Sequence, residues 1–208
     1  MKIIGIAAGL HAGSFVNRLL EAAGGELPES VGFEVWQGLG EIPPYEAGQP
    51  APAAVRELAG LIAAADAVIL TAPEHSLLPA ELSHTLDWLT AREALSGKHV
   101  AVMSASARAC GAMWAQAELY KRLQGAGAVV TGAELVILPG CRHFDEDGHL
   151  ADLVLREQVR AVIGPLCPAE LLEPALAAEA LEPAPRRREP ALKLCEPVLD
   201  VREPALSR

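Results

Sequence analysis

The sequence is poor in aromatic residues and contains no long uncharged apolar stretch. Aromatic side chains make up 4% of the 208 residues, which favours helices packed on a sheet of small side chains over an aromatic-rich sandwich. No window reaches about 18 uncharged apolar residues, so no membrane-spanning helix is expected. The N-terminal residues lead directly into a strand-like run and lack the layout of a signal peptide. We therefore expect a soluble, cytoplasmic protein.

Basic residues and paired cysteines are also scarce. The chain has 17 Lys and Arg against 27 Asp and Glu, and its net charge of −10 argues against a nucleic-acid partner. The negative net charge does not exclude a small anionic ligand, because the N-terminus of a helix binds a phosphate group locally. No CxxC pair occurs, so free thiols are expected. The four scattered cysteines are Cys110, Cys141, Cys167 and Cys195.

Apolar runs and helical patterns alternate through the first 164 residues. We expect strands at 2–7, 33–36, 67–72 and 98–104, and a fifth strand interrupted between 128–131 and 134–138. Helical spacing is found at 14–23, 53–65, 79–90, 112–124 and 148–163. This alternation predicts one α/β domain, residues 1–164, with a doubly wound parallel sheet of five strands. The proline- and glycine-containing loop 38–52 is too long for a plain connection.

Residues 165–208 have a different composition. They are dense in proline, and Glu-Pro-Ala-Leu occurs at 173–176, 189–192 and 203–206. Such a segment breaks helices and does not supply inner strands. We expect a disordered or loosely docked extension, with a partner-binding tail as the alternative.

Small or polar loops follow three of the expected strands, at 7–14, 73–79 and 104–111. In a sheet of order 2-1-3-4-5, the ends of strands 1, 3 and 4 lie side by side at the point where the strand order reverses. Ligands bind at this point in open α/β sheets, so one cofactor is able to contact all three loops.

Three motifs in these regions resemble the NADPH-dependent FMN reductase family of flavodoxin-like flavoenzymes. The family opening, GxSGSLRxxSxN, is similar to residues 5–18, and the family motif PEYNxSxPxxLKNxxDW is similar to residues 73–88. A family phrase, FDEDGxL, matches residues 144–150. The likeness covers about residues 1–163 and excludes the proline-rich extension.

The resemblance implies an FMN-dependent oxidoreductase that takes electrons from NADPH or NADH and passes them to a small acceptor such as a quinone or azo compound. It also implies a homodimer or homotetramer. The first loop would hold the FMN phosphate at a helix N-terminus, and the middle loop would pack against the isoalloxazine ring. The cofactor-binding residues implied are Gly9, Leu10, His11, Ser14, Asn17, Pro73, Glu74, His75, Ser76, Leu77, Ser104 and Gly111.

The motifs also depart from the family at positions where a cofactor would touch. Two family serines fall at Ala7 and Gly9, the family arginine falls at His11, and a Tyr-Asn pair becomes His75-Ser76. These changes support two alternatives. One is a flavin-free relative that acts as a ligand- or protein-binding module. The other is a reductase in which His11 replaces the arginine, so that FMN affinity falls as pH rises through the histidine range.

Other chemically interesting residues have structural explanations. Ser14 is either an N-cap only or part of a phosphate loop. The group His143, Asp145, Asp147 and His149 resembles a metal site, but its spacing favours a turn with an acidic helix start.

Further candidate site residues lie in the third loop and in the helix expected at 79–90. Arg108 would meet a nucleotide phosphate or lie in solvent, and Cys110 is a reactive or an inert thiol. Asp87-Trp88 is expected to be structural, with the indole in the core or at a subunit interface.

Overall fold

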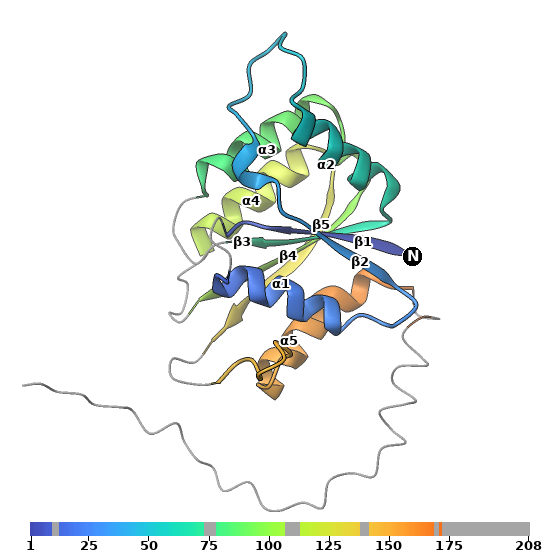
Figure 1. Cartoon of the computed structure of the whole chain (residues 1–208), viewed down its shortest axis with the longest axis vertical. Helices are drawn as coiled ribbons and strands as arrows, with labels where there is room; N and C mark the ends of the chain where they lie inside the picture. The colour runs from blue at the N-terminus through green and yellow to red at the C-terminus, as the bar shows by residue number, and fades with distance from the viewer. Residues whose placement is uncertain (10–12, 73–77, 107–112, 138–141, 169–170, 172–208) are drawn as a thin grey trace, which may run out of the picture.

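The computed structural model describes residues 1–9, 13–72, 78–106, 113–137, 142–168 and 171 (Figure 1). One parallel sheet crosses the molecule, with strand order β2-β1-β3-β4-β5. This confirms the predicted flavodoxin-like, doubly wound fold. The strands are β1 (Lys2–Ala7), β2 (Gly32–Trp36), β3 (Ala67–Ala72), β4 (His99–Ser106) and β5 (Val129–Val136).

Helices cover both faces of the sheet. Helices α1 and α5 lie on one face, and α2, α3 and α4 lie on the other (Figure 1). The helices are α1 (Phe15–Gly25), α2 (Ala53–Ala64), α3 (Ala80–Ala91), α4 (Met113–Gly125) and α5 (Leu153–Ile163), with short 3₁₀ turns η1 (Leu39–Glu41) and η2 (Gly164–Leu166). Among the described residues, no helix has the length and apolar character needed to span a membrane.

The central strands explain the apolar runs of the sequence. All six residues of β3 are buried, because helices cover the sheet on both sides. Side chains alternate between two cores: Val68 and Leu70 face α2, α3 and α4, and Ile69 faces α1 and α5. Leu166 and Cys167 are buried in the second core, so packed residues continue past Gly164.

Helices α1 and α5 are joined by a buried carboxylate. The side chain of Glu26, which follows α1, is only 6% exposed. It accepts hydrogen bonds from Arg156 Nε at 2.8 Å and from Arg160 Nε at 2.6 Å, both on α5. A buried charge needs such partners, so this ion pair ties the two helices of one face together.

The fifth strand is continuous, where the sequence predicted an interruption. Strand β5 pairs with β4 from Val129 to Val136, through Gly132. Gly132 has φ +155°, and a Cβ there would collide with the carbonyl oxygen of Val102. Glycine therefore allows the strand to pass through a backbone conformation that other residues rarely adopt.

The last helix begins later than predicted, at Leu153 and not at Gly148. The preceding residues form a tight turn in which Phe144 and Leu150 make an isolated antiparallel bridge. Asp152 then caps the helix, because its Oδ1 accepts hydrogen bonds from the N–H groups of Val154 and Leu155. The acidic residues at 145 and 147 thus belong to the turn and not to the first helical turn.

Candidate functional site at the carboxyl edge of the sheet

The carboxyl ends of β1, β3 and β4 meet at one edge of the sheet, as predicted. Ala7 pairs with Thr71 across β1 and β3, and Ala72 pairs with Ser104 across β3 and β4. The three loops predicted to form one site therefore begin from adjacent strand ends.

Four of the predicted cofactor-binding residues lie within the described structure: Gly9, Ser14, Asn17 and Ser104. The structure brings Gly9, Ser14 and Asn17 together at the start of α1, and Ser104 lies two strands away on the same edge. Candidates outside the described residues are Leu10, His11, Pro73, Glu74, His75, Ser76, Leu77 and Gly111, and also Arg108 and Cys110. A role for each of these residues in cofactor binding or at the site remains a prediction.

Ser14 is the N-cap of α1. Its Oγ accepts a hydrogen bond from the N–H of Asn17 at 3.3 Å, and its carbonyl oxygen accepts from the N–H of Arg18 at 3.0 Å. The cap places the positive end of the α1 dipole at the carboxyl edge of the sheet, where an anionic group is stabilised. Ser14 is therefore able to act both as the N-cap of α1 and as part of a phosphate-binding loop.

Gly9 lies against this N-cap with no room for a side chain. A Cβ on Gly9 would collide with Ser14 Oγ and Asn17 Oδ1, and would approach Val16 Cγ2 to 2.8 Å. The backbone after β1 therefore comes into direct contact with the start of α1. The same packing gives a physical reason why this position lacks the serine of the family motif.

Two buried hydroxyl groups lie at the ends of β3 and β4. Thr71 and Ser104 are both 0% exposed. Neither hydroxyl oxygen has a hydrogen-bond partner in the described part of the chain. Buried polar groups are normally paired, so these two hydroxyl groups are exceptions. Thr71 pairs in register with Met103 and Ser104 with Ala72, which belong to different cores, so the two hydroxyl groups face opposite sides of the sheet. Thr71 was missed from the sequence, although it is the one polar residue of β3.

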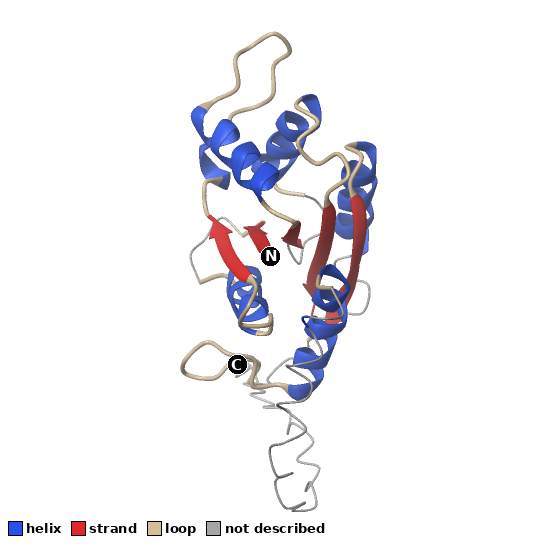
Figure 2. Ribbon diagram, turned by 90° about the vertical axis from the view of Figure 1, so that its right-hand side faces the viewer, coloured by secondary structure: helices blue, strands red, loops and turns tan. Residues whose placement is uncertain are grey.

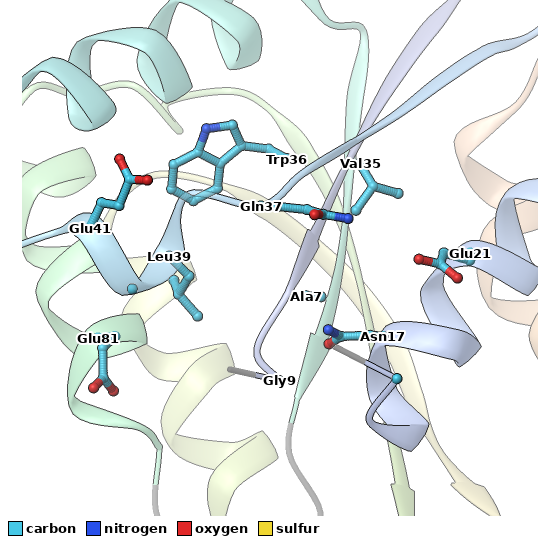
Figure 3. A pocket seen from close by; sticks show the side chains of 12 residues that line it. Ala7, Gly9, Asn17, Glu21, Val35, Trp36, Gln37, Leu39, Glu41 and Glu81 are labelled. Carbon is cyan, nitrogen blue, oxygen red and sulfur yellow. The ribbon is translucent and has the colours of Figure 1, made fainter. Parts of the chain in front are cut away.

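An open cleft of about 440 Å³ lies beside the first loop (Figure 3). Its floor is formed by Ala7 and Gly9, and Asn17 and Gln37 extend toward this floor from α1 and from the end of β2. The remaining lining residues come from the first loop, α1, β2, η1 and α3: Gly13, Glu21, Val35, Trp36, Leu39, Gly40, Glu41 and Glu81.

The cleft is negatively charged. Glu21 lies on its α1 side, and Glu41 and Glu81 lie on the η1 and α3 side (Figure 3). None of the described residues that line it is basic. Sequence reasoning missed these glutamates, because Glu21, Glu41 and Glu81 belong to three separate elements and share no motif.

The long loop 38–52 is packed on α3 and borders the cleft. It reaches away from the sheet beyond α2 and α3 (Figures 1 and 2). The indole Nε1 of Trp88 donates to the carbonyl oxygen of Pro43 at 2.9 Å, and the Tyr45 ring packs edge-on against the indole. Trp88 is 4% exposed, so its indole lies in the core, whereas Asp87 is exposed and pairs with Arg122.

The Asp- and His-rich segment forms the predicted turn. Asp145 Oδ1 accepts hydrogen bonds from the N–H groups of Asp147 and His149 at 3.0 and 2.8 Å. The bond from His149 is the main cause that lowers the pKa of Asp145. Nearby, His143 Nδ1 lies 3.2 Å from Asp152 Oδ2, and its ring contacts Phe15 at the start of α1. The turn is therefore held against the α1 N-terminus.

Comparison with known proteins agrees with this geometry. A NAD(P)H-dependent FMN reductase from Pseudomonas aeruginosa is 29% identical over 167 residues, which is 77% of this chain and 90% of the relative. Among solved structures, the flavoenzyme NAD(P)H:(acceptor) oxidoreductase FerB from Paracoccus denitrificans superposes with a TM-score of 0.69 at 24% identity, covering 79% of this chain and 96% of that one.

A NAD(P)H:quinone oxidoreductase from Methanothermobacter marburgensis has a TM-score of 0.59 at 22% identity, with 81% and 98% of the two chains covered. These two structures support the fold. The sequence profile of the NADPH-dependent FMN reductases matches residues 1–141. The chain therefore belongs to the NADPH-dependent FMN reductase family, and it is an oxidoreductase.

Proposed function

We propose that this protein binds FMN at the carboxyl edge of its sheet and uses NADH or NADPH to reduce a small acceptor such as a quinone or azo compound. We further propose that it works as a homodimer or homotetramer. The observation that carries the cofactor proposal is the meeting of the α1 N-terminus with the ends of β1, β3 and β4.

The described residues at this edge fit a flavin nucleotide. The capped N-terminus of α1 suits a phosphate, and Gly9 lets the backbone after β1 pack directly against this N-cap. Together, these groups would bind and orient the cofactor.

FMN, when bound, supplies the redox chemistry, because its ring accepts a hydride and passes on two electrons. The protein's contribution is positional and electrostatic. Ser14 stabilises the helix end that faces the phosphate, and the buried strand ends exclude water from one side of the site. No side chain has to act as a general acid or base for the hydride transfer.

The direct test is a visible spectrum of the purified protein before and after FMN is added and unbound flavin is removed. We expect a yellow protein with about one FMN per chain, bleached by NADH or NADPH without oxygen and recoloured by a quinone. A colourless protein that retains no FMN would overturn the proposal.

A flavin-free binding module is the alternative, and one observation favours it. The cleft beside the first loop has three glutamates and no basic lining residue within the described structure. The double variant Ala7→Ser/His11→Arg restores two family residues and distinguishes the two functions. If wild-type protein does not retain FMN and the double variant does, the alternative is supported. Gly9→Ser is unsuitable here, because its Cβ would collide with the N-cap.

A further inference from the structure

The start of α1 is fixed by residues that lie far along the chain, in the turn before α5. Helices α1 and α5 lie beside each other on one face of the sheet (Figure 1). The Phe15 ring, at the first position of α1, packs edge-on against the rings of His143 and Phe144, with centroids 5.7 and 5.3 Å away. Ring packing therefore adds to the backbone packing of Gly9 at this helix end.

The His143 ring is itself oriented by Asp152. Its Nδ1 lies 3.2 Å from Asp152 Oδ2, and the two side chains are 11% and 20% exposed. An ionised carboxylate only accepts hydrogen bonds, so Nδ1 is the donor. The other carboxylate oxygen accepts from the N–H groups of Val154 and Leu155 and caps α5. One carboxylate therefore links the N-cap of α5 to the ring that packs on α1.

Phe144 anchors this contact in the second hydrophobic core. It is a buried residue of that core and makes the isolated bridge with Leu150. Its ring also lies under the Arg18 guanidinium, whose central carbon is 4.3 Å from the ring centroid. The turn before α5 thus contacts two side chains in the first turn of α1, Phe15 and Arg18.

The first turn of α1 is the part of the helix that the proposed phosphate site uses. Its N–H groups are the donors, and hydrogen bonds weaken steeply when donor and acceptor are misaligned. The favourable field of the helix also falls off within one turn. Side chains that fix this turn therefore control how well a phosphate is bound.

We infer that His143 and Phe144 are positioning residues for the FMN phosphate and act through Phe15 on the first turn of α1. This inference rests on the proposed FMN-binding function. Neither residue has to touch the cofactor. They set the preference for FMN over riboflavin, which has the same ring system and lacks the phosphate.

A comparison of FMN with riboflavin isolates the phosphate end of the site. The full chain is freed of flavin, and quenching of flavin fluorescence gives both dissociation constants. We expect His143→Ala to weaken FMN binding about tenfold and riboflavin binding less than about twofold, since charged hydrogen bonds to the phosphate are lost. A residue that only stabilises the fold would change both affinities alike. An unchanged preference for FMN would overturn the inference.

His149→Ala is the matched control within the same turn. His149 Nδ1 lies 3.4 Å from Asp145, and its ring lies beside Gly25 at the other end of α1. We expect this variant to keep the wild-type preference for FMN. A loss as large as that of His143→Ala would contradict the assignment to the ring contact at the start of α1.

Two further variants separate positioning from folding. Asp152→Asn keeps a good N-cap for α5 but removes the charge that orients His143, and we expect the preference for FMN to fall about threefold. Phe15→Leu removes the ring on which His143 acts. Adding His143→Ala to Phe15→Leu should therefore cause little further loss, because residues that act as one unit are not additive. Additive losses, or an unchanged preference in folded Asp152→Asn, would overturn the inference.

The same titrations distinguish failure of the inference from failure of the proposed function. Wild-type protein that binds FMN and riboflavin equally would overturn the inference and leave flavin binding intact. A preference for FMN that survives in His143→Ala would have the same meaning. Wild-type protein that binds neither flavin would overturn the proposed function and this inference with it.

Discussion

The contact between Gly9 and the N-cap of α1 shows how single residues shape the site. Ser14 Oγ and Asn17 Oδ1 occupy the space that a side chain on Gly9 would need. The first loop therefore brings backbone, rather than a family serine, to the helix end. Capping of α1 and the proposed phosphate binding depend on the same few atoms.

Gly9→Ala should lower both stability and FMN affinity. The added methyl group forces apart the loop and the start of α1, and such overpacking costs about 1–3 kcal/mol. Urea unfolding followed by circular dichroism measures the free energy, and flavin fluorescence quenching measures FMN affinity. Gly60→Ala is the control, because nothing lies within 4 Å of its Cβ position inside α2. It should leave the protein as stable or slightly more stable. Equal stability of Gly9→Ala and wild type would contradict the packing argument.

At the level of elements, side-chain hydrogen bonds decide where helices begin and how they are held. The sequence predicted the start of the last helix at Gly148, but the Asp145 turn and the Asp152 cap move it to Leu153. Acidic residues occur both in turns and in first helical turns, so local composition did not separate the two. The capping hydrogen bonds of Asp152 distinguish the turn from the first helical turn.

Glu26→Gln tests the link between α1 and α5. The neutral amide keeps the shape but loses the negative charge that Arg156 and Arg160 contact. The arginine side chains are 37% and 38% exposed, and we expect a loss of about 1–3 kcal/mol, less than for a fully buried pair.

Chemical denaturation provides the measurement. The matched control is Glu118→Gln, which removes the exposed partner of Arg122 on α4 and should cost less than about 0.5 kcal/mol. Similar losses of unfolding free energy in both variants would show that burial does not strengthen the ion pairs of Glu26.

At the scale of the whole molecule, the described part of the two hydrophobic cores runs from Met1 to Leu171. The second core therefore includes the first residues of the proline-rich extension. Burial of the apolar strands between two helical layers supplies the main stabilising free energy of such a fold. The boundary of the domain near residue 164 stays a prediction, with Leu166 and Cys167 packed just beyond it.

Removal of residues 172–208 should therefore leave the fold intact. We expect the melting temperature to change by less than about 2 °C, since a loss of 1 kcal/mol shifts it by about 2–4 °C in a domain of this size. Thermal unfolding by circular dichroism gives the comparison with the full chain. A substantially lower melting temperature would show that the extension stabilises the domain.

Local patterns in the sequence were sufficient for the elements, the strand order and the family. Apolar runs such as 67–72 and helical spacing arise from burial on a regular backbone, and the motifs identified the family before any contact was known. The meeting of three loops also followed, because parallel strands end at the same edge.

Only the tertiary structure decided which side chains share a site. Gln37 and the cleft glutamates lie on different elements, and their proximity depends on crossovers between strands that are distant in sequence. The same holds for Gly9 against Ser14 and for Glu26 against α5. Local periodicity carries information about burial, whereas contacts between elements depend on how the whole chain packs.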